Sequence, residues 1–163
     1  MAKARDVEGL LPQTPYGLAA ATTVRVRAEE LFDHAEGVLD TGDTSRVHDM
    51  RVATRRLRAV LELYAPCFPA RELRPVLRDV KRLAAALGER RDPDVQLASV
   101  AAFARGVGDA ERPGVDLVAA TIRAEQAAGN ERLAAALAQA ATSDLRGRLD
   151  ALADAAEQRA QAA

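Results

Sequence analysis

Apolar residues recur along this chain with the period of an α-helix, with no alternating pattern typical of strands. Between residues 16 and 39 they follow the spacing i, i+4, i+7, i+8 from Val24 onward, which marks one buried helical face. Comparable patterns predict five more helices, at about residues 44–64, 76–87, 92–105, 114–140 and 142–160. Short connections join them, so the sequence predicts an all-α fold, an antiparallel bundle of about six helices.

Prolines and glycines set the predicted boundaries. Pro75 removes a helical hydrogen bond, so it either kinks the third segment or lies near its N-terminus. Gly88 is expected just after the end of that helix, with Asp92 and Pro93 beginning the next one. Residues 1–14 show no periodicity and are expected to form a flexible N-terminal arm before a single bundle over residues 15–163.

The second predicted helix carries a row of cations beside its apolar face. His48, Arg51, Arg55 and Arg58 fall within an arc of roughly 80° at the helical rotation per residue. Like charges one turn apart repel, and only Glu62 lies nearby, so we expect an anionic ligand to compensate. The alternative is a solvent-facing stripe balanced by an acidic neighbouring helix.

A second basic stripe is predicted on the third helix. It consists of Arg78, Lys81 and Arg82, and Arg71 and Arg74 extend it only if the helix continues upstream of Pro75. Arg90 and Arg91 are expected in the connection before the fourth helix, where the adjacent helix N-terminus favours anions. Read alone, these two residues could equally be solvated loop arginines.

The net charge of −1 hides a strong asymmetry along the chain. Residues 46–91 contain 12 Lys and Arg against 5 Asp and Glu, whereas the remaining residues contain 11 against 19. A basic centre within an acidic chain suggests a local anion site rather than a generally cationic protein.

Several kinds of chemistry have no counterpart in the sequence. We find no glycine-rich phosphate loop, no histidine and cysteine cluster with metal-ligand spacing, and no candidate catalytic pair. Aromatic residues are too few to form a stacking platform for single-stranded nucleic acid. No segment resembles a signal peptide or a membrane span, and the single Cys67 is expected to be a packed residue. We therefore expect a cytoplasmic, non-catalytic binding protein without a cofactor or metal.

Two segments, VHDMRVATRRLR at 47–58 and LRDVKRLAAALGERRDPDV at 77–95, resemble the CHAD family, helical domains named for a histidine that bind inorganic polyphosphate. Their signature residues here are His48, Arg51, Arg55, Arg56, Arg58, Lys81, Gly88, Arg90, Arg91 and Asp92. The resemblance implies a bacterial polyphosphate-binding protein, which could also associate with polyphosphate granules. The candidate ligand-binding residues are His48, Arg51, Arg55, Arg58, Arg78, Lys81, Arg82, Arg90 and Arg91, with Arg56 and Arg74 as further candidates.

Family members usually contain two bundle repeats related by a pseudo-two-fold axis, and each repeat has its own histidine-bearing basic helix. Residues 107–163 contain no histidine, so this chain resembles a single repeat. It could be a natural half-length member, a fragment, or a protomer that forms a homodimer and rebuilds the two-repeat groove. The ExExK signature of the triphosphatase domain found in some relatives is missing.

Four functional hypotheses follow. The first is non-catalytic binding of polyphosphate, in which arginine engages two phosphate oxygens and His48 donates a hydrogen bond, with affinity rising as the pH falls. The second is a histidine phosphotransfer bundle with His48 as phosphoacceptor. The third is binding to the phosphate backbone of duplex nucleic acid, which the acidic overall charge disfavours. The fourth is a purely structural module, which predicts that the two basic stripes lie apart and pair with acids of the first and fifth predicted helices.

Overall fold

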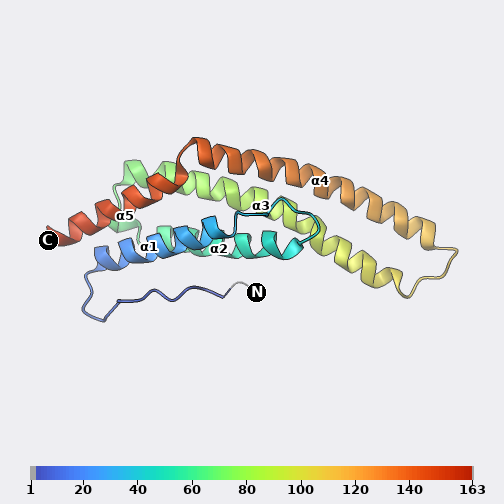
Figure 1. The fold of residues 1–163 in the computed structure, drawn as a ribbon, viewed down its shortest axis with the longest axis horizontal. Helices are drawn as coiled ribbons and strands as arrows, with labels where there is room; N and C mark the ends of the chain where they lie inside the picture. The colour runs from blue at the N-terminus through green and yellow to red at the C-terminus, as the bar shows by residue number, and fades with distance from the viewer. Residues whose placement is uncertain (1–2, 163) are drawn as a thin grey trace.

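The computed structural model describes residues 3–162, which form five α-helices and one short 3-10 turn, with no strand in this range (Figure 1). The all-α prediction is therefore confirmed. Residues 1 and 2 of the predicted arm, and Ala163, lie outside the described residues. The elements are α1 (Tyr16–Asp33), α2 (Thr44–Leu63), η1 (Ala65–Cys67), α3 (Ala70–Ala104), α4 (Arg112–Thr142) and α5 (Leu145–Gln161).

Helices α2 and α5 contact α3, α1 packs against α2 and α5, and α4 packs along α3 (Figure 1). The loop-proximal ends of α3 and α4 extend beyond the other helices as a two-helix projection (Figure 1). None of the helices in residues 3–162 is long and apolar enough to cross a membrane. The fold thus combines a compact bundle with a longer hairpin.

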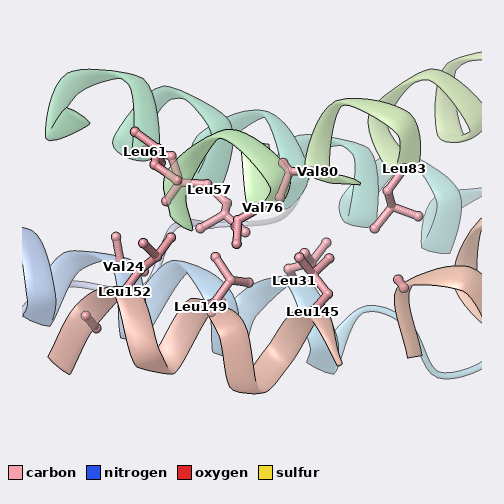
Figure 2. Packing of buried hydrophobic residues seen from close by; sticks show 14 of the residues in the cluster. Val24, Leu31, Leu57, Leu61, Val76, Val80, Leu83, Leu145, Leu149 and Leu152 are labelled. Carbon is pink, nitrogen blue, oxygen red and sulfur yellow. The ribbon is translucent and has the colours of Figure 1, made fainter. Parts of the chain in front are cut away.

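Leucine, valine and alanine fill the centre of the bundle (Figure 2). Helices α1, α2, α3 and α5 each contribute buried residues to one continuous cluster, as the helical periodicity predicts. The side chains labelled in Figure 2 are Val24 and Leu31 from α1, Leu57 and Leu61 from α2, Val76, Val80 and Leu83 from α3, and Leu145, Leu149 and Leu152 from α5. Burial of these side chains positions α2 and α3 side by side.

Helix α3 is one continuous helix of 35 residues, so the predicted break after Gly88 is wrong. Gly88 does not adopt the positive φ that would end a helix, and both Pro75 and Pro93 lie inside the helix. A proline in a helix interior costs about 3 kcal/mol or more, so packing must offset this cost. Helix α4 lies along α3 and supplies that packing. The predicted count of six helices becomes five for this reason.

A buried polar network joins α3 to α4. The guanidinium of Arg90 and the carboxylate of Asp94 are fully buried and form an ion pair one turn apart. Arg90 Nε donates to Asn130 Oδ1 at 3.0 Å, and Gln126 Nε2 donates to Asp94 Oδ1 at 2.6 Å. Asn130 Nδ2 also donates to the carbonyl of Leu39, at 3.0 Å, which ties in the loop between α1 and α2. The network fixes the register of the two longest helices.

A second buried charge ties the N-terminal segment to α1. Glu30 accepts a hydrogen bond from the backbone amide of Arg5 and pairs with Arg27 Nη1 at 2.7 Å, and Arg56 Nη1 lies 4.0 Å away. Burial alone would raise the pKa of Glu30, but the hydrogen bonds from Arg5 and Arg27 outweigh it and lower the pKa below its usual value. Arg5 also pairs with Asp33 of the same helix, so this segment is attached to α1.

Replacing Glu30 with glutamine should lower the free energy of unfolding at neutral pH by about 1–3 kcal/mol, because buried donors lose their charged acceptor. The pKa of Glu30 is lower in the folded than in the unfolded protein, so its contribution is complete above the unfolded pKa and is lost as pH falls through the folded value. Urea unfolding would measure the free energies of unfolding of wild type and Glu30→Gln. These should differ at pH 7 and become similar below about pH 4. Glu29→Gln, at an exposed neighbouring site, is the control.

Replacing Arg90 with leucine should destabilise the protein by about 3–5 kcal/mol, because Asp94 would be left buried without its main partner. Arg91→Leu is the matched control, since Arg91 Nη1 lies 3.9 Å from Asp94 and its side chain is a quarter exposed. Thermal unfolding followed by circular dichroism would measure both. Equal decreases in melting temperature for Arg90→Leu and Arg91→Leu would contradict the structural role of Arg90.

Candidate anion-binding site

Helices α2 and α3 pack side by side and run antiparallel (Figure 1). An open hollow of about 360 Å³ lies between them, which we call the α2–α3 groove. Cations from both helices surround it, and its floor is formed by small or apolar side chains. The lining residues are Arg51, Val52, Arg55 and Arg58 from α2, and Lys81, Ala84 and Ala85 from α3. The stripe on α2 therefore meets Lys81 of the predicted α3 stripe, in contrast to the separation that the structural-module hypothesis predicts.

The groove exists because the cations and the core residues occupy different faces of α2. Arg51, Arg55 and Arg58 are exposed, whereas Thr54 and Leu57, on the adjoining side of the helix, are completely buried. The alanines of α3 have no bulk to fill the space between the helices. The core therefore holds the cations together although they repel one another.

A single carboxylate bridges one end of the groove. Glu62 accepts a hydrogen bond from Arg58 Nε at 3.0 Å and lies 3.3 Å from Lys81 Nζ. The hydrogen bond from Arg58 lowers the pKa of Glu62 below its usual value, so this carboxylate is ionised at neutral pH. Arg51 and Arg55 form no hydrogen bond or ion pair with any residue between 3 and 162. Glu62 therefore compensates only part of the positive charge.

Three further predicted residues lie along the same two helices. His48 is one turn before Arg51 on α2 and is partly exposed. Arg74 and Arg78 are exposed on α3, about two turns and one turn before Lys81 respectively, and the helix does continue upstream of Pro75. None of the three lines the hollow itself.

Other predicted residues are directed elsewhere. Arg82 lies 3.5 Å from Asp79 and lines a separate hollow between α3 and α4. Arg56 faces α1, 4.0 Å from the buried Glu30. The structure brings neither of them into the α2–α3 groove.

The predicted loop location of Arg90 and Arg91 is wrong, since both are in the middle of α3. Arg90 is fully buried in the contact with α4, so its guanidinium is not accessible to a ligand. Arg91 is a quarter exposed and 3.9 Å from Asp94. Arg90 and Asp94 are four residues apart in the sequence, and this spacing could have indicated an ion pair within one helix.

Sequence reasoning did not identify the floor of the groove. Val52, Ala84 and Ala85 are adjacent to the basic stripes in sequence, but small residues give no signal by themselves. No group of three or more histidine, cysteine, aspartate or glutamate side chains among residues 3–162 could hold a metal ion. The arrangement offers several positive donors to an extended, multiply charged anion.

Comparison with known proteins gives one match. The family model described as the CHAD domain matches residues 23–163, which include most of α1 and the whole of the other helices. No curated protein and no solved structure matches the chain. Because the family model covers nearly the whole sequence, including both basic stripes, the chain belongs to the CHAD domain family.

Proposed function

We propose that this protein binds inorganic polyphosphate, or a similar chain of phosphates, in the α2–α3 groove, without catalysing a reaction. The supporting observation is that four cations from two helices surround one open hollow, and two of them, Arg51 and Arg55, have no partner among the described residues. Membership of the CHAD family supports the same ligand class.

The shape of the groove favours an extended anion over a single phosphate. Arg51 and Arg58 are seven residues apart, which corresponds to about 10 Å along a helix at about 1.5 Å per residue. Guanidinium groups engage phosphate oxygens in pairs and stay charged at all relevant pH values. A chain of phosphates could contact several cations at once and relieve the repulsion between them.

Reversing the charge of Arg51 and Arg55 together, as Arg51→Glu/Arg55→Glu, should abolish polyphosphate binding because the uncompensated cations become anions. Both side chains are exposed, so helicity and melting temperature should stay close to wild type. Arg105→Glu/Arg112→Glu makes the same change in net charge at exposed arginines of the α3–α4 hairpin and is the control. Isothermal titration at two salt concentrations would measure the affinities.

Wild-type affinity should also fall steeply with added salt, because phosphate contacts are electrostatic. Competition with duplex DNA separates polyphosphate binding from recognition of any phosphate backbone, since both hypotheses use the same residues. Retained affinity in the groove variant, or tighter binding of DNA than of polyphosphate, would refute the proposal. Acid-labile phosphate on His48 would instead support the phosphotransfer hypothesis.

Replacing Glu62 with glutamine should raise polyphosphate affinity about 2- to 5-fold, the size expected from releasing one exposed ion pair. The change frees Arg58 and Lys81 from their internal carboxylate. Glu72→Gln removes a comparable exposed pair near the start of α3, away from the groove, and should leave the affinity unchanged. Equal affinity of Glu62→Gln and wild type would show that Glu62 does not compete with the ligand.

The homodimer that would bring two grooves together stays a prediction. Light scattering with and without long-chain polyphosphate would test it, because a rebuilt two-repeat groove requires twice the mass of the protomer.

A further inference from the structure

Gly88 is a glycine that the fold does not require. It lies inside α3 with helical backbone geometry, and a Cβ atom built there would meet no heavy atom within 4 Å. Glycine destabilises a helix interior relative to alanine, so its presence at this site weakens α3 without a compensating contact.

Two other helical glycines, Gly129 and Gly17, differ in this respect. A Cβ at Gly129 would lie 3.0 Å from the Glu89 carbonyl oxygen and 3.1 Å from Arg90 Cα, so a side chain there would press against the backbone of α3 where α4 packs on it. At Gly17, a Cβ would lie 2.7 Å from the Ala156 carbonyl oxygen. Those two glycines serve packing, whereas Gly88 faces open space.

The position of Gly88 follows from the antiparallel register of α2 and α3. Lys81, Ala84 and Ala85 line the α2–α3 groove, and Gly88 is the next residue with the same helical spacing. A second hollow, farther along, is lined by Thr44 of α2 and Asp94 of α3.

His48 takes the corresponding place on the other helix. It lies between Thr44 and Arg51 on α2, as Gly88 lies between Ala85 and Asp94 on α3. His48 on α2 and Gly88 on α3 therefore lie one helical turn beyond the end of the α2–α3 groove that Arg51 and Ala85 form.

We propose that the missing side chain at Gly88 extends the α2–α3 groove by one helical turn, so that a polyphosphate chain lies directly against the backbone of α3 beside His48. The inference rests on the proposed function and makes Gly88 a specificity-determining residue for long chains. An anion short enough to stay within the hollow between Arg51, Arg55, Arg58 and Lys81 does not reach this turn.

The test compares stability and affinity in the same variants. Gly88→Ala and Gly88→Leu should keep or raise the melting temperature, by a few degrees, because no neighbour obstructs the new side chain. Gly88→Leu should weaken binding of long-chain polyphosphate at least about tenfold and change the affinity for tripolyphosphate little. Gly114→Ala and Gly114→Leu are matched controls, since a Cβ at Gly114 in α4 also meets nothing within 4 Å.

The outcomes separate this inference from the proposed function. If wild type binds no polyphosphate at low salt, the proposed function fails. If wild type binds and Gly88→Leu binds the long chain equally well, Gly88 has no role in binding and the inference is overturned. A lower melting temperature for Gly88→Ala would also overturn it, because the glycine would then serve folding.

Discussion

The buried ion pair between Arg90 and Asp94 lies within α3, and its hydrogen bonds to Asn130 and Gln126 of α4 join the two longest helices. Both charged groups have lost water, so each depends on the other and on the amides of Gln126 and Asn130. These contacts come from α4 and lie where Gly88 and Pro93 would otherwise weaken α3. Because α3 is continuous, the same helix packs on α2 and on α4. It therefore forms one wall of the α2–α3 groove and also one of the two helices of the α3–α4 hairpin.

The core residues and the groove cations occupy adjoining faces of α2. Leu57 and Leu61 are buried in the apolar cluster, whereas Arg51 and Arg55 are exposed to solvent. Water and salt weaken the repulsion between exposed charges, so the apolar contacts hold them at a modest electrostatic cost. A polyanion in the groove would replace this repulsion with attraction.

Arginines that look alike in the sequence have different roles in the structure. Arg55 and Arg56 are neighbours, but a rotation of about 100° directs the first to the groove and the second to Glu30 of α1. Arg90 and Arg91 are also neighbours, and only Arg90 is fully buried. Helical spacing on α2 correctly grouped Arg51, Arg55 and Arg58. The same reasoning failed at Arg90 because it depended on a helix break that does not occur.

The all-α fold, the apolar faces of the helices, the cationic row on α2 and the likeness to the CHAD family can all be recognised from the amino-acid sequence alone. These features depend on residues within a few helical turns of one another, so local spacing is enough to recognise them. Only the tertiary structure decided that α3 continues through Gly88, that Arg90 is buried and that Arg58 and Lys81 share one groove. The partner of Arg90 on α4, Asn130, is 40 residues away, and a contact at that distance depends on how whole helices pack.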